Sequence, residues 1–410
     1  MQNKRKSIEF KEFSFGLFGI AFCLVFISLI GLYSISQNSS GNIFSSPFYK
    51  QILILIPSFI ISIMLLYIPK YSIHKYVYHA YFFGIIFILL PFLNPKYAGT
   101  HRWFDLGLPF MIQPSEFAKV FTVLALARYL SDHNLRMQKF QSIILPIILA
   151  LIPTIIVMNQ PDLGTSIVIL APILPMLYWS GANSFYLFLI LAPILSMLTV
   201  FHTLAFTLWA MILAIVIILS RSKLSFSIIM FFGNIFLGLL SPVFWGMLSN
   251  YQQNRIITFF NPEKDPLGAA YQIIQSKTAI GSGGLFGKGW GEGTQTHLKF
   301  LPVQESDFIL SVLSEELGFF CIFFILIMVG ILINKIIKNS FLSKDRFSSL
   351  ALIGFATIFL SHVFVNTAMT VGLIPVKGLP FPFISAGGSF LLSSFVMLGL
   401  CINLSANYSD

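Results

Sequence analysis

The amino-acid sequence predicts an all-α polytopic membrane protein. The chain has 410 residues, of which 56% are hydrophobic and 10% are charged, whereas soluble domains carry about 25% charged residues. The apolar residues are gathered in long blocks, and a helix needs about 20 of them to cross a hydrocarbon core of roughly 30 Å. These blocks lack the alternating pattern of a barrel strand, so we expect helices, which satisfy their own backbone amides.

Twelve blocks are candidates for transmembrane helices. Several are short or contain proline, so we expect ten to twelve crossings and treat residues 1–410 as a single integral membrane domain. The blocks are Ser14–Ser36, Tyr49–Ile68, Tyr76–Leu93, Ser115–Leu130, Ser142–Met158, Leu163–Ser180, Ser184–Val200, His202–Ser220, Leu224–Gly246, Asp307–Ile333, Phe347–Val371 and Ser389–Ala406.

The net charge of +10 has the distribution expected from membrane topology. If both termini are cytoplasmic, the short loops on that side carry an excess of Lys and Arg, while the charges on the other side balance. The charge therefore indicates no nucleic-acid partner. Long connections fall on the outer side, at residues 94–114, 247–306 and 372–388. Because such connections are usually functional, we place the working surface on that side.

The segment from Gly281 to Gly293 is rich in glycine and superficially resembles a phosphate-binding loop. Ser282 occupies the position of the first required glycine, and Lys288 precedes glycine rather than serine or threonine, so the Walker pattern is not met. We expect a flexible loop that lies on the membrane surface, with Trp290 as an interfacial anchor.

Charged residues stand at the starts of several predicted helices, where they can cap the helix or act on a substrate. Asp162 follows a proline and could accept amide hydrogens from the next turn as an N-cap; this role and a functional one can coexist. Glu116 and Lys119 lie three positions apart on one helix face. That spacing fits either a structural ion pair or a cation that binds an anionic substrate group.

The stretch from Phe300 to Glu316 is the most suggestive of catalysis. Asp307 opens a predicted helix, and Glu315 and Glu316 follow about two turns deeper. Carboxylates near one helix start can perturb each other's pKa or hold a divalent cation. The structural alternative is capping by Ser306, with the acids interacting favourably with the helix dipole.

Taken together, these stretches resemble the SEDS family of bacterial cell-wall polymerases (shape, elongation, division and sporulation). The matching motifs occur in family order over nearly the whole chain. They are Arg102–Gly107, Gln113–Glu116, Gln160–Thr165, Asn254–Ile256, Asn261–Glu263, Asp265–Gly268, Tyr271–Ser276, Ala279–Gly281, Ser306–Phe308, Glu315–Gly318 and Gly378–Ser389. Gly287–Trp290, Gly293–Thr296 and Pro375–Val376 are more similar to the elongation branch (RodA) than to the division branch (FtsW).

The resemblance implies a peptidoglycan glycosyltransferase that polymerises lipid II, a disaccharide-pentapeptide on undecaprenyl diphosphate, during cell elongation. The 4-hydroxyl of one sugar displaces the lipid diphosphate from another and forms a β-1,4 bond. Asp307 matches the family's essential loop aspartate and is the expected general base. The residues expected to bind substrate are Arg102, Glu116, Lys119, Asp162, Gln253, Arg255, Glu316 and Ser385, with Arg102, Lys119 and Arg255 as the cations that meet the departing diphosphate.

The same resemblance implies the surroundings of the reaction. No organic cofactor is expected, and a divalent cation (Mg²⁺ or Mn²⁺) could be held near Asp307. The expected partners are a class B penicillin-binding protein, which crosslinks the strands, and other membrane proteins of the elongation complex. The expected location is the bacterial cytoplasmic membrane, with the active site on its outer face.

Three departures from the family pattern bear on these expectations. Val303 and Glu305 stand where the family commonly has Glu and His, so the pKa tuning of the aspartate and any metal site can differ. Met111 stands where many relatives carry a basic residue. The family normally has ten helices, and residues 163–251 are about forty residues longer than we expect, enough for one additional helical hairpin. We place this inserted hairpin at residues 184–220.

Two other functions deserve a test, namely a flippase for lipid-linked oligosaccharides and a non-enzymatic scaffold for wall-synthesis proteins. A flippase needs access that alternates between the two faces and polar residues through the depth of the membrane, whereas here the polar residues cluster on one side. A scaffold has no need for cations near helix ends. The polymerase is therefore our leading hypothesis.

Overall fold

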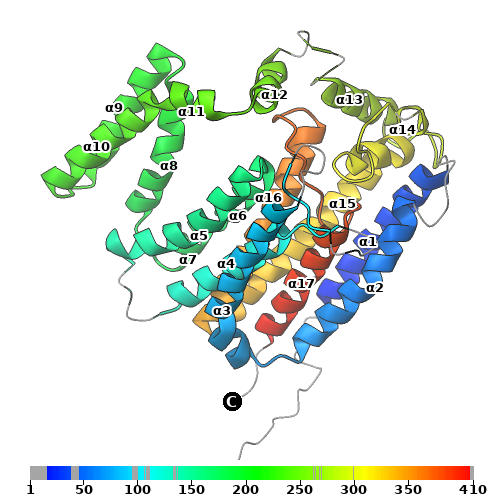
Figure 1. Ribbon diagram of the computed structural model, residues 1–410, viewed down its shortest axis with the longest axis horizontal. Coiled ribbons are helices and arrows are strands. Elements are labelled where there is room, and N and C mark those ends of the chain that lie inside the picture. Colours follow the sequence, from blue (N-terminus) through cyan, green and yellow to red (C-terminus); the bar gives the residue numbers. More distant parts are fainter. Residues whose placement is uncertain are drawn as a thin grey trace, which may run out of the picture.

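The computed structural model describes residues 16–37, 46–94, 100–105, 107, 111–132, 135, 137–261, 263, 265–266, 268, 270–298 and 300–406. Within these ranges each of the twelve predicted blocks forms one or two helices, and the β pairing consists of an isolated bridge between Phe104 and Ile112 (Figure 1). The predicted all-α polytopic fold is therefore confirmed.

The main bundle is built from helices of both halves of the chain, with the C-terminal helices at its centre (Figure 1). Its helices are α1 (Gly16–Gln37), α2 (Pro47–Leu66), α3 (Lys70–Leu89), continued by the short 3-10 helix η3 (Leu90–Leu93), α4 (Ser115–Leu130), α5 (Gln141–Asn159), α6 (Leu163–Leu170), α7 (Ile173–Trp179), α15 (Ile309–Leu342), α16 (Arg346–Thr370) and α17 (Gly388–Ser405). Helix α17 packs along α2, and α16 contacts α15, α4 and α7. These contacts bury α17 around most of its circumference.

Polar side chains close the helix ends at one end of this bundle. The side-chain amide of Asn403 contacts the backbone carbonyls of Leu65, Leu66 and Ile68 at the end of α2, at 2.8–3.2 Å. The last carbonyls of a helix lack partners within the helix and are costly to bury unpaired. This one amide therefore explains why α2 can end against α17 inside the protein.

Seven helices are long and apolar enough to cross a membrane, judged by length and composition over the described residues. The pair α10 (Leu224–Leu239) and α11 (Ser241–Met247), bent by 45°, would make an eighth span. The remaining predicted spans form shorter helices, among them α8 (Ser184–Thr199) and α9 (Thr203–Leu219). The chain is thus a multi-pass membrane protein, while the figure of ten to twelve crossings stays a prediction.

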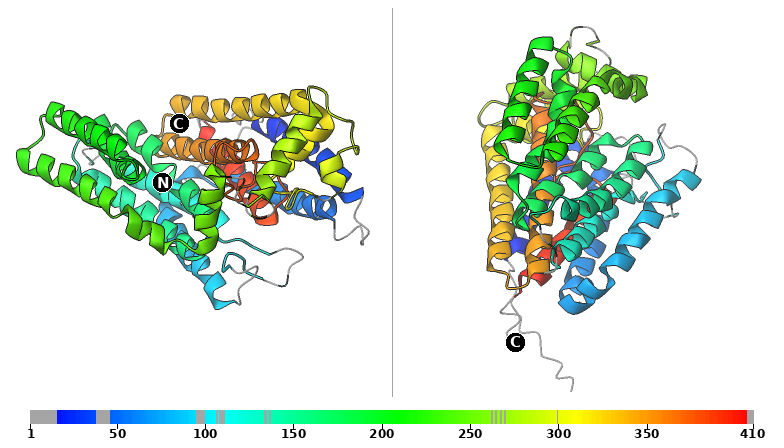
Figure 2. Two further views of the ribbon diagram at one scale, coloured as in Figure 1. Left: turned by 90° about the horizontal axis from the view of Figure 1, so that it is seen from above. Right: turned by 90° about the vertical axis from the view of Figure 1, so that its left-hand side faces the viewer.

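Helices α8 to α11 form an arm that projects from the main bundle (Figure 2). The arm has an apolar cluster of its own, which includes Leu189, Trp209 and Leu213. The Trp209 indole also donates a hydrogen bond to the Ser196 hydroxyl at 2.9 Å, joining α9 to α8. The hairpin predicted at residues 184–220 corresponds to α8 and α9, and its status as an insertion stays a prediction.

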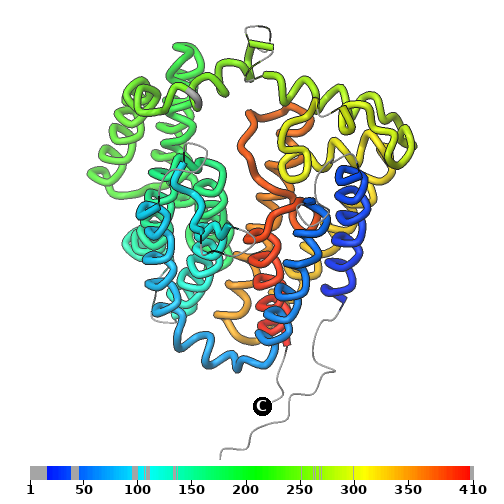
Figure 3. Tube along the Cα trace, turned by 45° about the vertical axis from the view of Figure 1, so that its right-hand side comes forward, coloured from blue at the N-terminus to red at the C-terminus, as the bar shows by residue number. Residues whose placement is uncertain are grey.

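The segment 247–306 crosses one end of the bundle and contains helices (Figure 3). These are α12 (Asn250–Phe260), α13 (Tyr271–Gly283) and the single turn α14 (Thr294–His297). Ser249 and Gln252 form a capping box at the start of α12, in which each side chain pairs with a backbone amide of the other residue. The segment is therefore structured and not the plain loop that we expected.

Helix α15 is broken at Gly318, and the glycine-rich segment repairs the break. Gly318 has φ = +78°, a conformation that glycine adopts without the steric cost that a Cβ imposes. The amides of Lys288 and Gly289 donate to the carbonyls of Glu315 and Glu316 at 2.9 and 3.1 Å. In return, the amides of Phe319 and Phe320 donate to the carbonyls of Gly284 and Leu285 at 3.0 and 3.3 Å.

The expectation that this glycine-rich loop is flexible is therefore wrong, while its position at the membrane surface stays a prediction. Backbone groups freed by a helix break need partners inside the protein, and residues 284–289 provide them. Trp290 is also fixed, since its indole donates to the Ile30 carbonyl at 3.2 Å and stacks on the Tyr33 ring. Composition alone suggested mobility because it does not show which carbonyls the loop would meet.

Replacing Gly318 with alanine should destabilise the protein strongly. A Cβ at this position would lie 2.3 Å from the Gly287 amide nitrogen in addition to straining φ, and a strained backbone residue costs about 1–3 kcal/mol before any clash. Gly330→Ala is the matched control, because it lies in the same helix with open space around its Cα. We expect a lower apparent Tm for Gly318→Ala alone; equal Tm values for the two variants would contradict the account.

Candidate active site

Asp307 lies in a turn two residues before α15 and is partly buried. Its amide donates to the Val303 carbonyl at 3.2 Å, and the Ser306 hydroxyl donates to its carboxylate at 3.2 Å. Val303, one of the departures from the family pattern, has φ = +55°, a region that β-branched residues rarely adopt. The helix begins at Ile309 with no side-chain cap, so the expectations that Asp307 opens it and that Ser306 caps it are wrong.

A second segment, residues 371–387 between α16 and α17, wraps around this turn. The Ser385 hydroxyl donates to the Ser306 carbonyl at 2.5 Å and accepts from the Phe381 amide at 2.8 Å. The Ala386 amide donates to the Glu305 carbonyl at 2.9 Å. Ser385, a predicted substrate-binding residue, is 1% exposed, and both recorded hydrogen bonds of its hydroxyl are to backbone groups. In this structure it positions the two segments against each other.

Asn366 on α16 locks the same two segments together. Its side-chain amide donates to the carbonyl of Asp307 at 2.9 Å and to that of Leu379 at 2.7 Å. Four residues earlier on the same helix face, His362 Nδ1 donates to the Pro380 carbonyl at 3.1 Å. We did not predict either residue as part of the site. The available signal was a pair of polar residues spaced i, i+4 within an apolar helix.

Two cations, Arg255 and Arg102, act electrostatically on the Asp307 carboxylate. Burial raises the pKa of Asp307 to about 6, while the Ser306 hydrogen bond, Arg255 on α12 and Arg102 oppose that rise. A further cation, Lys377, neighbours Arg255, and burial together with Arg255 lowers the pKa of Lys377. Arg255 also donates to the carbonyl of Val376 at 2.8 Å, which ties α12 to the 371–387 segment.

Two of these cations were predicted, and the structure brings both close to the predicted base. Arg102 comes from the segment before α4 and donates a hydrogen bond to the Pro161 carbonyl. Lys377 was missed in the sequence, where it stands alone next to Gly378 in a loop. A Cβ on Gly378 would lie 3.3 Å from Asp307 Oδ2, so the loop backbone itself approaches the carboxylate closely.

Glu116 and Lys119 form a buried ion pair inside the bundle. The Lys119 ammonium lies 2.5 Å from the Glu116 carboxylate and 2.9 Å from His362 Nε2, and Lys119 is 0% exposed. It also lies 5.0 Å from the centre of the Phe390 ring. Of the two roles left open by the sequence, this geometry shows the structural one. A role in substrate binding stays a prediction.

Asp162 and Gln253 also make hydrogen bonds that fix the backbone. Asp162 accepts from the Thr165 amide and hydroxyl as the N-cap of α6, and from the Gln113 side chain at 2.9 Å. The Gln253 side chain donates to the Trp245 carbonyl at 2.8 Å. The predicted N-cap is therefore present, and the substrate contacts of both residues stay predictions.

Glu315 and Glu316 belong to the helix break, about 12 Å along α15 from Asp307 at 1.5 Å per residue. Both are buried. The Glu315 carboxylate pairs with Lys288 at 2.7 Å and accepts hydrogen bonds from Thr294, Gln295 and Thr296. Ser34 donates to Glu316 at 2.7 Å. They hold the glycine-rich segment to the bundle, and a substrate contact by Glu316 stays a prediction.

The side chains around Asp307 do not fit a metal held by the protein. Over the described residues, no three His, Cys, Asp or Glu side chains converge as ligands. The acid beside Asp307 is Glu305, and Arg102 and Arg255 contribute positive charge to the same site. Mg²⁺ and Mn²⁺ prefer an octahedral set of oxygen ligands, which this arrangement of one acid pair among cations does not supply.

Comparison of the sequence with known proteins assigns the chain to a family. The model of the FtsW, RodA and SpoVE cell cycle proteins matches residues 15–209 and 204–410, which together include all the site residues named above. The chain belongs to this family. The two matched parts meet within α9.

Relatives and solved structures agree with this assignment. The chain is 34% identical over 307 residues to the peptidoglycan glycosyltransferase MrdB of Escherichia coli K12, covering 75% of this chain and 71% of the relative. It is 32% identical to the peptidoglycan glycosyltransferase RodA of Treponema pallidum, covering 96% and 98%. A chain of a solved peptidoglycan synthase complex that coordinates polymerization and crosslinking superposes with TM-score 0.71, 24% identity and coverage of 96% and 97%. Thermus thermophilus RodA superposes with TM-score 0.64, 22% identity and coverage of 97% and 98%.

Removing Glu116 alone should destabilise the protein more than removing the whole ion pair. Glu116→Gln leaves the Lys119 ammonium buried without its counter-ion, a change that typically costs 3–5 kcal/mol. The double variant Glu116→Gln/Lys119→Met replaces the pair with uncharged groups of similar size, so most of the lost stability should return. Thermal unfolding in detergent measures both. A double variant as unstable as the single one would contradict this reading of the pair.

Proposed function

We propose that this protein is a peptidoglycan glycosyltransferase that polymerises lipid II into β-1,4 glycan strands during cell elongation, with Asp307 as the general base. The observation that carries the proposal is the partly buried carboxylate of Asp307, on which Arg255 and Arg102 act at one end of a membrane-embedded bundle. The relatives named as peptidoglycan glycosyltransferases support the same reaction class. The charged pair inside the bundle, Glu116 and Lys119, is closed on itself and on His362, which supports polymerisation over flipping, because flipping needs a polar path across the membrane.

The base acts on the 4-hydroxyl of the acceptor sugar. As the hydroxyl oxygen bonds to the anomeric carbon of the donor, its proton passes to the Asp307 carboxylate. The bond between that carbon and the diphosphate oxygen breaks, and the electron pair leaves with the diphosphate. A single displacement converts an α linkage into a β linkage. A pKa of about 6 leaves Asp307 ionised at neutral pH yet more basic than an ordinary aspartate, which suits general-base catalysis.

The cations meet the charge that develops on the leaving diphosphate. Fixed positive groups stabilise such charge most where they are already oriented and shielded from water. Arg255 is held by the Val376 carbonyl and Arg102 by the Pro161 carbonyl, so both are oriented before substrate arrives. Lys377 is half-buried beside Arg255. Asn366 and Ser385 act as positioning residues, because they hold the backbone on either side of the base.

The topology that we propose places this site on the outer face of the bacterial cytoplasmic membrane, with both chain termini inside. The excess of basic residues in short loops supports that orientation. The lipid tails of the substrate would then lie between helices, and the sugars at the charged end. We further propose a class B penicillin-binding protein as the crosslinking partner, alongside other membrane proteins of the elongation complex. The solved complex that couples polymerization and crosslinking, whose chain shares this fold, supports that choice.

The divalent cation expected from the resemblance stays a prediction. Since the side chains at the site do not form a metal cage, we derive no step that depends on the ion. Polymerisation assays with Mg²⁺, with Mn²⁺ and with a chelator decide whether one is needed. A metal carried to the site by the diphosphate of the substrate would be compatible with the residues present.

Asp307→Asn should abolish polymerisation while leaving the protein at least as stable. The folded pKa of about 6 exceeds the ordinary value of 3.8, so folding stability falls as pH rises from about 4 to 6, when the buried acid must ionise. The neutral amide avoids that cost, and above pH 6 the apparent Tm should equal or exceed the parent value. Labelled lipid II, supplied with the purified protein and its crosslinking partner, measures the activity.

The pH profile provides the control for this experiment. The kcat/KM of the parent protein should fall below pH 6 as Asp307 is protonated. Polymer formed by Asp307→Asn at the parent rate would remove Asp307 from the mechanism. Lipid II movement across vesicles in the absence of polymer, under every metal and partner condition, would favour the flippase.

Lys377→Met should lower kcat more than it raises KM, by on the order of 10²-fold, the loss typical of removing one group that stabilises charge in the transition state. Arg221→Met is the matched control, because Arg221 is an exposed cation in the turn between α9 and α10. The test is steady-state polymerisation with both variants. A kcat for Lys377→Met equal to that of the control would show that this lysine does not contact the leaving group.

A further inference from the structure

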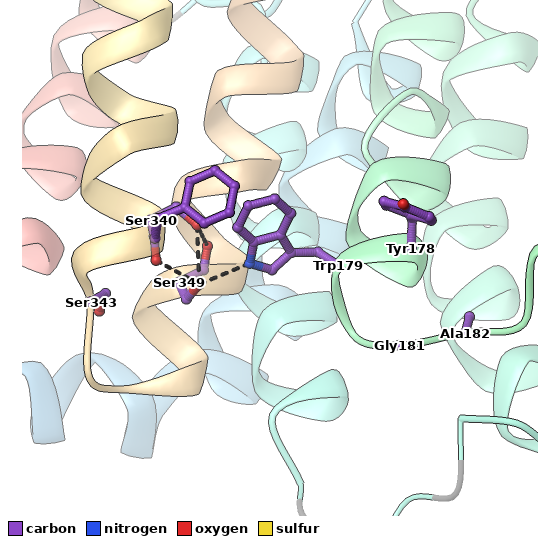
Figure 4. A pocket seen from close by; sticks show the side chains of 8 residues that line it. Tyr178, Trp179, Gly181, Ala182, Ser340, Ser343 and Ser349 are labelled. Atoms are coloured by element: carbon purple, nitrogen blue, oxygen red, sulfur yellow. Dashed lines mark hydrogen bonds between the residues drawn. The ribbon is translucent and has the colours of Figure 1, made fainter.

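Two adjoining cavities lie at the end of the bundle opposite Asp307. Their volumes are about 590 and 530 Å³, and Gly181 lines both. They are formed where the turn between α7 and α8 meets the turn between α15 and α16 and the segment before α5 (Figure 4). The part of α15 after its break at Gly318, about 36 Å long at 1.5 Å per residue, lies between this end and the active site. Neither cavity takes part in the reaction proposed above.

The smaller cavity is basic. Lys139 and Arg346 line it together with polar groups of Gln138 and Ser180. One Arg346 nitrogen donates to the Ser180 carbonyl at 3.1 Å, which fixes the guanidinium at the wall. Over the described residues, neither cation lies within ion-pair distance of a carboxylate.

The nearest acid in the sequence is already used elsewhere. Asp345 precedes Arg346, and its carboxylate accepts hydrogen bonds from the Phe347 and Ser348 amides and from the Ser348 hydroxyl as the N-cap of α16. A carboxylate held in this way faces the helix start. Asp345 therefore makes no ion pair with Arg346 among the described residues.

The larger cavity is aromatic, and its side chains are partly open to the surroundings. Tyr178 is 65% exposed and Phe341 is 70% exposed. The rings of Trp179 and Phe341 meet edge to face with centres 4.4 Å apart. The Trp179 indole donates to the Ser349 hydroxyl at 2.9 Å, and Ser349 in turn bonds Ser340 (Figure 4). This chain of hydrogen bonds forms a rigid side of the cavity.

We propose that the paired cavities bind one anionic phospholipid, with its phosphate headgroup between Lys139 and Arg346 and an acyl chain along Tyr178 and Phe341. Basic pockets between helices at the cytoplasmic side typically hold anionic headgroups, and aromatic side chains concentrate at the level of the membrane interface. A free phosphate would use the basic cavity but not the aromatic one, so the pairing of the two favours a lipid.

The position of the site gives the bound lipid a structural effect. Residues 180–183 connect α7 of the bundle to α8 of the arm, and the cavities lie against this connection. Arg346 already holds the Ser180 carbonyl from the bundle side. A phosphate that engages both Arg346 and Lys139 would add a second tie between the segment before α5 and the start of α16, and would stiffen the joint of the arm.

Native mass spectrometry of the full-length protein in detergent tests the proposal, with phosphatidylglycerol as the probe and phosphatidylcholine as the neutral comparison. The variant Lys139→Gln/Arg346→Gln should raise the Kd for phosphatidylglycerol by about tenfold or more, as expected for the loss of two cations near a membrane surface. Arg221→Gln/Lys223→Gln is the matched control. It removes two exposed cations from the turn between α9 and α10, outside both cavities, and should leave the Kd unchanged.

A second variant guards against misfolding of the first. Ser343→Phe fills the larger cavity from the α15–α16 turn and keeps both cations, and it should also weaken phosphatidylglycerol binding. Equal Kd values for all variants overturn the proposal. Displacement of the lipid by millimolar inorganic phosphate would identify free phosphate as the ligand and overturn the lipid assignment. If the variants bind phosphatidylglycerol as the parent does but no longer bind the crosslinking partner, the occupant is a protein segment. That outcome also overturns the lipid assignment.

Discussion

Inside a bilayer, every backbone amide and carbonyl has to find its partner within the protein, and this constraint organises the structure around two places where helices are interrupted. At Gly318 the helix α15 breaks, and residues 284–289 replace the lost hydrogen bonds. Just before α15 the backbone around Asp307 is non-helical, and the 371–387 segment together with Asn366 pairs its carbonyls. In both cases a loop far away in the sequence completes the hydrogen bonding of a helix end. The hydrogen bonds of the 371–387 segment and Asn366 hold the backbone around Asp307. This arrangement leaves the Asp307 carboxylate near Arg102 and Arg255.

Burial separates the charged residues into two classes with different physical roles. Lys119 lies in the bundle core, where its cost of burial is offset by Glu116 and by one ring nitrogen of His362, whose other nitrogen donates to the Pro380 carbonyl. Arg255 and Lys377 are only half-buried at the end of the bundle. A cation enclosed by its own counter-ion stabilises the fold, whereas one next to Asp307 and open to solvent can meet an incoming phosphate. The two classes are coupled, since His362 and Asn366 anchor the same segment that carries Lys377.

The two ends of the bundle are therefore built for different tasks. One end is covered by α12, α13 and α14 and brings Arg102 and Arg255 close to Asp307. The other end combines basic and aromatic walls beside the joint of the arm formed by α8 to α11. Because α15 and α16 run between the two ends, a change at the joint has a continuous packed path to Asn366.

Much of this protein could be predicted from its sequence, because hydrophobic blocks and short motifs are local signals. The all-α polytopic fold, the placement of the helices, the family and the aspartate at position 307 with Arg102 and Arg255 beside it all followed from such patterns. The tertiary structure alone decided which role each polar residue takes. Lys119 and Arg255 look equally suited to a phosphate in the sequence, and only packing shows that one is enclosed. Lys377 and the order of the glycine-rich segment were likewise invisible, since both depend on backbone partners that are far away along the chain and meet only in the folded bundle.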